Sequence, residues 1–103
     1  MMNLLKETLA VMHENGKGKA DVRWFGTNGK CEIPLEQFGE ALNVDYDNGY
    51  GGTEIDMDLV VVGDDWWLER HEYDGAEWWE YKTLPQKPKK KMENVSVKER
   101  WHL

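Results

Sequence analysis

Cysteine and serine are almost missing from this sequence, and their scarcity removes whole classes of site. The lone Cys31 excludes a disulfide within the chain and any cysteine-rich zinc site, and we expect it to be a buried, reduced thiol. The single serine, Ser96, lies in the C-terminal tail, and none of the three histidines has a second histidine near it in the sequence. Nucleophilic catalysis therefore has little to work with, and we predict neither an enzyme nor a cofactor.

Long apolar runs are also missing. No segment is apolar and long enough to span a membrane, and residues 1–3 show no signal-peptide pattern. We therefore expect a cytoplasmic protein that has no membrane partner. A chain of 103 residues is expected to form one domain with a modest core.

Basic residues are scarce outside the C-terminus. Residues 1–85 contain 18 acidic and 7 basic side chains, a net charge of −11, whereas residues 86–103 carry +4. An acidic body repels nucleic acid and is steered toward basic surfaces, so we predict that it does not bind nucleic acid directly.

The basic C-terminus has the composition of a linker. Pro85 and Pro88 prevent a strand from continuing, and the lysines between residues 87 and 91 repel one another. We predict a single α+β domain over residues 1–85 and a basic, Pro/Lys-rich tail over residues 86–103. Ser96 and Glu99 stand at capping-box spacing, so the end of the tail is either a short docked helix or a disordered arm.

Apolar periodicity predicts an amphipathic helix at the N-terminus. Asn3 can cap it, and Asn15 with Gly16 can end it. The apolar residues at helical spacing are Leu4, Leu5, Leu9 and Met12, and we expect the helix to pack on a sheet through Leu5, Leu9 and Met12.

Strands follow the helix. Residues 21–25 and 30–33 flank Asn28 and Gly29, a pair typical of a two-residue type I′ turn, and Pro34 can open a short second helix. Residues 55–62 read as a strand that is central in the sheet. The predicted fold is an N-terminal helix packed on an antiparallel sheet of about five strands, with the short second helix after the first hairpin.

The most informative feature is a tryptophan-rich hairpin. Four of the six tryptophans form two adjacent pairs, Trp66 with Trp67 and Trp78 with Trp79, on either side of an Asp-Gly turn at residues 74–75. Successive strand residues point to opposite faces, so each pair places one indole on each side of the sheet. Something must therefore cover the second set of indoles.

The register of this hairpin can be argued from charge. A two-residue turn would set Glu72 opposite Glu77 and Glu69 opposite Glu80, and opposed like charges are unfavourable. We therefore predict a three-residue loop over residues 73–75.

That register sorts the aromatic residues into two groups. It places Trp66 and Trp78 on one face and Trp67, Trp79 and Tyr81 on the other. One group should be internal and the other available for binding. The candidate binding residues are Asp64, Asp65, Trp66, Trp67, Glu69, Arg70, Glu72, Trp78, Trp79 and Tyr81.

Two weaker candidates concern chemistry. Asp45, Asp47 and Glu54 fall near the spacing of a calcium loop, but Asn48 stands where that loop needs glycine. His71 lies among carboxylates and is the best candidate for acid–base work, although a half-exposed imidazole is the simpler interpretation.

The hairpin sequence also carries a resemblance. With the stretch Tyr-Asp-Gly-Ala-Glu-Trp-Trp-Glu at residues 73–80, residues 46–88 resemble small proteins encoded by phages and prophages of Gram-positive bacteria. The resemblance implies a bacterial host cell and a context in which small acidic proteins bind and inhibit host enzymes, including nucleases of restriction or CRISPR defence.

We therefore predict an acidic, phage-encoded binding protein that inhibits a host defence or nucleic-acid enzyme, with a host protein such as a nuclease as its partner. A homodimer is also expected, because symmetric pairs are the commonest assembly. The alternatives are a small metal-dependent or carbohydrate-acting enzyme and a self-associating structural module.

Overall fold

A five-stranded antiparallel sheet forms the centre of the fold. The computed structural model describes residues 1–49 and 51–95. The strand order is β3-β2-β5-β6-β7, and the strands are β2 (Trp24–Thr27), β3 (Cys31–Ile33), β5 (Leu59–Val62), β6 (Trp66–Tyr73) and β7 (Ala76–Thr83). The predicted α+β architecture is confirmed, and β5 is the central strand as expected.

The N-terminal helix, α1 (Leu4–Glu14), begins and ends where the sequence indicated. The Asn3 side chain accepts a hydrogen bond from the Lys6 backbone N–H at 3.0 Å, and Gly16 takes a positive φ of 72° after the last turn. The backbone ahead of α1 also pairs with a distant segment. The strand β1 (Met2–Asn3) forms a two-stranded sheet with β4 (Asp45–Tyr46).

The buried face of α1 differs from the predicted one. Leu4, Thr8 and Met12 are buried, whereas Leu9 is 42% exposed. Residues spaced by four lie along one side of a helix, and Leu9 falls one position away from that side. The expected packing through Leu9 is therefore wrong, and Thr8 takes the central place.

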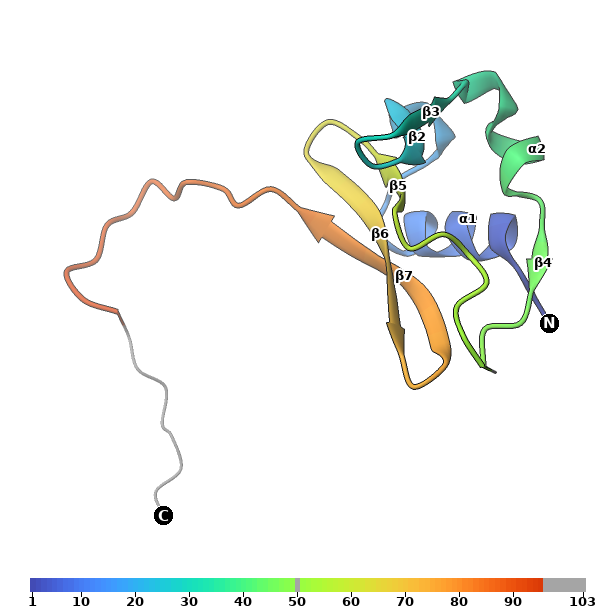
Figure 1. Ribbon diagram of the computed structural model, residues 1–103. Coiled ribbons are helices and arrows are strands. Elements are labelled where there is room, and N and C mark those ends of the chain that lie inside the picture. Colours follow the sequence, from blue (N-terminus) through green and yellow to red (C-terminus); the bar gives the residue numbers. More distant parts are fainter. Residues whose placement is uncertain (50, 96–103) are drawn as a thin grey trace, which may run out of the picture.

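Both helices of the described chain pack on the same face of the sheet. After the 3-10 turn η1 (Lys19–Asp21) and the first hairpin, η2 (Leu35–Gln37) leads into α2 (Phe38–Leu42). Phe38 of α2 meets Phe25 of β2 edge to face, with ring centroids 5.0 Å apart. We call this helix-covered side the inner face and the opposite side the outer face (Figure 1).

The tryptophan hairpin has a two-residue turn, although the charge argument predicted a three-residue loop. Tyr73 pairs with Ala76, and Asp74 and Gly75 form a two-residue turn with φ values of 52° and 88°. Glu72 therefore does lie opposite Glu77. The predicted three-residue loop is wrong, because Glu77 is buried against a cation on the inner face while Glu72 is exposed to water.

A one-residue change of register moves every side chain of a strand to the other face. The inner face of the hairpin carries Trp66, Trp79 and Tyr81, and the outer face carries Trp67 and Trp78. The predicted grouping of these residues is therefore wrong. The prediction that each Trp pair places one indole on each side of the sheet is confirmed.

The first hairpin also differs in its turn. Thr27 pairs with Cys31, which leaves the three residues 28–30 in the loop, and Gly29 alone takes a positive φ there. The two-residue turn predicted for Asn28 and Gly29 is wrong. Cys31 is exposed because it lies on the edge strand β3 beside this loop, so the predicted buried thiol is also wrong.

The last described residues leave the domain. Residues 84–95 form neither helix nor strand and run away from the sheet after β7 (Figure 1). The predictions for Ser96 and Glu99 lie outside the described residues. No helix of the described residues is long and apolar enough to cross a membrane.

Gly63 provides a test of the packing around the second hairpin. A Cβ atom added at Gly63 would lie 2.0 Å from Nε1 of the buried Trp66. We expect Gly63→Ala to lower the free energy of unfolding by about 1–3 kcal/mol, the usual cost of overpacking. Urea unfolding measures the change. The matched control is Gly39→Ala in α2, where an added Cβ meets nothing within 4 Å; equal losses in both variants would contradict the packing described.

Candidate functional site

Two of the predicted binding residues, Trp66 and Trp79, belong to the core, and a third, Tyr81, packs against it while partly buried. Trp66 stacks on Tyr81 with ring centroids 5.8 Å apart. Trp79 is 5% exposed, and its indole N–H donates to the Thr8 hydroxyl of α1 at 2.8 Å. The Trp79 hydrogen bond joins the hairpin to α1, and burial leaves Trp66 and Trp79 unavailable to a partner.

Arg70, another predicted binding residue, is buried as well. Its Nη2 donates to the carboxylate of Glu77 at 2.9 Å and to the hydroxyl oxygen of Tyr46 at 3.0 Å, while Nη1 lies 3.5 Å from the carboxylate of Glu7. The guanidinium also stacks 4.9 Å from the centroid of the Trp79 ring. Burial alone would lower the pKa of Arg70, but the bonds to Tyr46 and Glu77 and the charge of Glu7 raise it. The group is therefore a permanent internal cation.

Glu77 connects this cation to a distant loop. Its carboxylate accepts the backbone N–H groups of Glu54 at 2.6 Å and Ile55 at 3.2 Å, in addition to Arg70. Tyr46 donates its hydroxyl proton to Glu7 at 2.5 Å, and burial together with that bond raises the pKa of Tyr46 to about 12. We interpret this group of four side chains, Glu7, Tyr46, Arg70 and Glu77, as an internal clamp.

The three carboxylates predicted for a calcium loop, those of Asp45, Asp47 and Glu54, all accept hydrogen bonds from the protein. Asp45 accepts a hydrogen bond from the Asn3 side chain, and Asp47 accepts from the backbone N–H of Gly49. Glu54 accepts from the backbone N–H of Asp47 at 3.1 Å. Within the described ranges, no three His, Cys, Asp or Glu residues are grouped so that they could hold a metal ion. These carboxylates order the loop between β4 and β5.

The remaining acidic candidates lie apart from one another. Asp64 forms an exposed ion pair with Arg23 at 2.8 Å, and Asp65 is exposed in the turn before β6. Glu72 is exposed near the tip of the hairpin. Exposed ion pairs contribute little to stability, so the Asp64 pair does not define a site.

The outer face of the hairpin carries a repeated arrangement of indole and carboxylate. The indole N–H of Trp67 donates to Glu69 at 2.7 Å, and the indole N–H of Trp78 donates to Glu80 at 3.0 Å. In both cases the acceptor stands two residues further along the same strand. The polar atom of each indole is therefore satisfied within the hairpin, and the rings are held in place.

His71 lies between the two carboxylates of this arrangement. Its Nε2 is 2.6 Å from Glu69 and 3.9 Å from Glu80. The bond from Trp67, followed by that from His71, lowers the pKa of Glu69, and the bond from Trp78 lowers the pKa of Glu80. Both carboxylates are charged at neutral pH, and the indole hydrogen bonds together with the nearby Lys82 offset the repulsion between the opposed Glu69 and Glu80.

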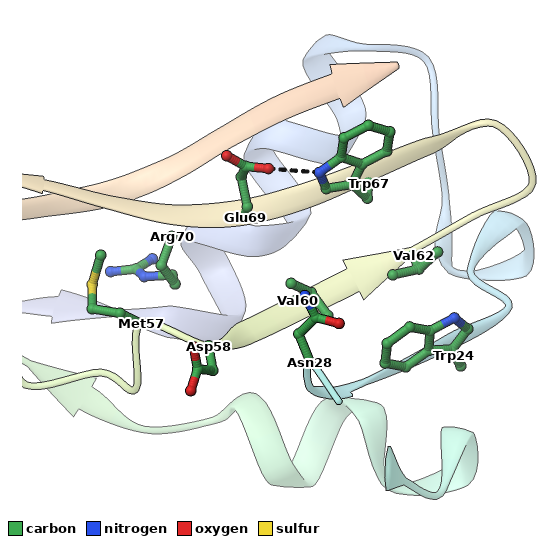
Figure 2. A pocket seen from close by; sticks show the side chains of 9 residues that line it. All are labelled: Trp24, Asn28, Met57, Asp58, Val60, Val62, Trp67, Glu69 and Arg70. Atoms are coloured by element: carbon green, nitrogen blue, oxygen red, sulfur yellow. Dashed lines mark hydrogen bonds between the residues drawn. The ribbon is translucent and has the colours of Figure 1, made fainter. Parts of the chain in front are cut away.

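A groove runs along the outer face beside this arrangement. Its floor is Val60 and Val62 of the central strand β5, and Trp24 and Trp67 stand on the neighbouring strands, both paired in register with Val62. The cavity volume is about 390 Å³, Asn28 lies beside Val60, and Asp58 lies toward the end away from the two indoles (Figure 2). We call this feature the Trp24/Trp67 groove.

Sequence reasoning found only part of the groove. Trp67 and Glu69 were predicted as binding residues, but Trp24, Val62 and Asp58 were not. Trp24 belongs to a predicted strand, and because side chains alternate along a strand, Trp24 lies on the outer face while its neighbour Phe25 lies on the inner face. Only the strand order brings Trp24 and Trp67 together, and that order was not predicted.

The arrangement on the outer face is suited to recognition. It combines fixed aromatic rings, apolar floor residues and charged carboxylates on a sheet face that neither helix covers.

No protein-family model, curated protein or solved structure matches this chain.

The clamp is tested by removing one charge. Glu77→Gln replaces the closer carboxylate partner of the buried Arg70 by a neutral amide and leaves only the longer contact with Glu7, and breaking a buried ion pair costs about 3–5 kcal/mol. The matched control is Glu72→Gln on the opposing strand, which changes an exposed carboxylate and should alter stability by at most about 0.5 kcal/mol. Urea unfolding of both variants at neutral pH makes the comparison, and similar losses would contradict the burial of Glu77.

Because the folded state lowers the pKa of Glu69 on the outer face, we expect the protein to lose stability in acid. The pKa of Glu69 is lowered from 4.5 in the folded state, so its contribution is present above that value and is lost as the pH falls through the folded pKa. We expect Glu69→Gln to show a shallower fall in unfolding free energy between about pH 6 and about pH 3 than the wild type. Glu40→Gln, an exposed change on α2, should keep the wild-type slope. Equal slopes in all three proteins would refute the assignment.

Proposed function

We propose that this chain is a non-enzymatic binding protein, encoded by a phage, that inhibits a host defence or nucleic-acid enzyme. The observation that carries the proposal is the outer face of the sheet. Both helices pack on the inner face, while Trp24, Trp67 and Trp78 stay half-buried on the other side among charged carboxylates. Tryptophan residues fixed at the centre of a surface are typical anchors of protein interfaces.

Charge supports a basic partner. Residues 1–85 carry a net charge of −11, and the outer face contributes Glu69, Glu80 and Asp58 to it. Enzymes that act on nucleic acid present basic surfaces to the phosphate backbone. An acidic body is steered toward such a surface and competes there with the nucleic acid.

The rival function is a small metal-dependent or carbohydrate-acting enzyme. It would use the loop of Asp45 and Asp47 or the imidazole of His71. In the structure these two aspartates are hydrogen-bonded to Asn3 and Gly49, and His71 lies on an open sheet face beside Glu69. Calorimetry with Ca²⁺ and Mg²⁺ separates the two functions, because tight metal binding would favour the rival.

The proposed inhibition can be measured in cells. The chain is expressed in bacterial strains that each carry one restriction or CRISPR system, and phage plating is compared with strains that lack the system. We expect the wild type to raise plating in at least one protected strain and to change nothing in the unprotected ones. No rise in any protected strain would contradict the proposal.

Variants then locate the inhibiting surface. Trp67→Ala combined with Trp78→Ala removes two outer indoles, and loss of interface anchors of this kind weakens binding by about 30-fold or more. Leu9→Ala is the control, because Leu9 is an exposed residue of α1, and α1 lies on the inner face of the sheet, away from the outer indoles. The double variant should lose protection of the phage while the control keeps it, with circular dichroism showing that both are folded. Equal protection by both would place the inhibiting surface elsewhere.

The homodimer expected from the sequence stays a prediction. If two copies meet through their outer faces, the carboxylates Glu69 and Glu80 of both copies meet as well. Added salt screens such repulsion, so sedimentation should show more dimer at about 0.5 M NaCl than at about 0.05 M. A monomer at both salt concentrations would exclude the homodimer.

A further inference from the structure

The Trp24/Trp67 groove has the chemistry of a site for one organic cation, and this inference rests on the proposed function. Val60 and Val62 form an apolar floor, and the two indoles stand on either side of it. The N–H of Trp67 is already bonded to Glu69. A partner that approaches this indole therefore meets its aromatic ring, whose negative face attracts cations.

Carboxylates lie where the charge of such a cation would be neutralised. Glu69 lies beside Trp67, and Asp58 lies toward the end of the groove (Figure 2). Lys30 bonds one carboxylate oxygen, Oδ2, of Asp58, and both side chains of that pair are about half exposed to water. A hydrated surface pair of this kind is weak and can rearrange when a second cation arrives.

Arg70 also lines the groove, but its charge is already balanced. Its guanidinium is buried and faces the carboxylates of Glu77 and Glu7. The other two charged side chains that line the groove are Asp58, which is paired only with the exposed Lys30, and Glu69, so the charge that faces the groove is negative. An anionic ligand is disfavoured there.

We propose that the Trp24/Trp67 groove binds an arginine side chain of the partner protein, which lies between the indoles and extends its guanidinium group along the groove toward Asp58. The planar guanidinium stacks on aromatic faces and bonds a carboxylate through two parallel N–H groups, which a lysine ammonium cannot do. The aliphatic part of the side chain packs on Val60 and Val62. Basic surfaces that bind nucleic acid are rich in arginine, which agrees with the proposed class of partner.

The test uses capped arginine, N-acetyl-arginine methylamide, and the full chain. Capped citrulline has the same shape without the charge and is the matched ligand control. Indole N–H signals are followed by NMR after assignment by single Trp→Phe substitutions. We expect capped arginine to shift the signals of Trp24 and Trp67 saturably, to leave those of the core residues Trp66 and Trp79 in place, and to bind about tenfold more tightly than citrulline.

Two variants locate the site within the groove. Asp58→Asn should weaken arginine binding by about three- to tenfold, while Glu40→Gln, on α2, should not change it. Val62→Phe fills the floor between the indoles and should abolish the shifts in a protein that remains folded. Equal binding of arginine and citrulline, or binding unaffected by both groove variants, would overturn the proposal.

The basic tail is the competing occupant. A full-length variant in which Lys87, Lys89, Lys90 and Lys91 are changed to glutamine tests it. We compare the indole signals of this variant with those of the wild type, both without arginine. If the signals of Trp24 and Trp67 differ, and the variant binds arginine more tightly than the wild type, the tail occupies the groove and the proposal fails. The outcome is separate from the plating assay, because inhibition in cells without arginine binding would refute the groove and leave the proposed function standing.

Discussion

The buried ion pair between Arg70 and Glu77 is the interaction on which the rest of the structure depends. A charge in a protein interior is costly unless it is paired with an opposite charge. Arg70 is paired through its Nη atoms with Glu77, Tyr46 and Glu7, which come from β7, β4 and α1, while its buried Nε has no hydrogen-bond partner among the described residues. Glu77 in turn holds the backbone of the loop before β5. One cation thus connects the helix, both sheets and the longest loop.

The same pair explains the register of the tryptophan hairpin. Arg70 and Glu77 can meet on the inner face only when the turn has two residues, because a three-residue loop would bring Trp78 opposite Arg70 and send Glu77 outward. The repulsion between Glu72 and Glu77, which the sequence suggested, is small beside a buried ion pair. The register then decides which indole of each tryptophan pair is in the core and which is on the outer face.

The sequence predicted the helix starts and the central strand, but not the two turn lengths or the long-range partners. The N-cap at Asn3, the helix after Pro34 and the central place of the strand predicted over residues 55–62 follow from short-range patterns, and the structure has them, with the strand limited to residues 59–62. The partnership of Arg70 with Glu7 joins residues 63 positions apart, and no local pattern reports it. The Trp24/Trp67 groove was missed for the same reason, since it exists only because β5 lies between β2 and β6.

Each tryptophan pair is divided between core and surface, which leaves an aromatic, acidic face for a partner. The most direct measurement is the relaxation enhancement that a soluble paramagnetic agent causes at the indole N–H groups. We expect strong enhancement for Trp24, Trp67 and Trp78 and weak enhancement for Trp66 and Trp79. Protection of Trp66 together with Trp78, and exposure of Trp67 together with Trp79, would contradict this division.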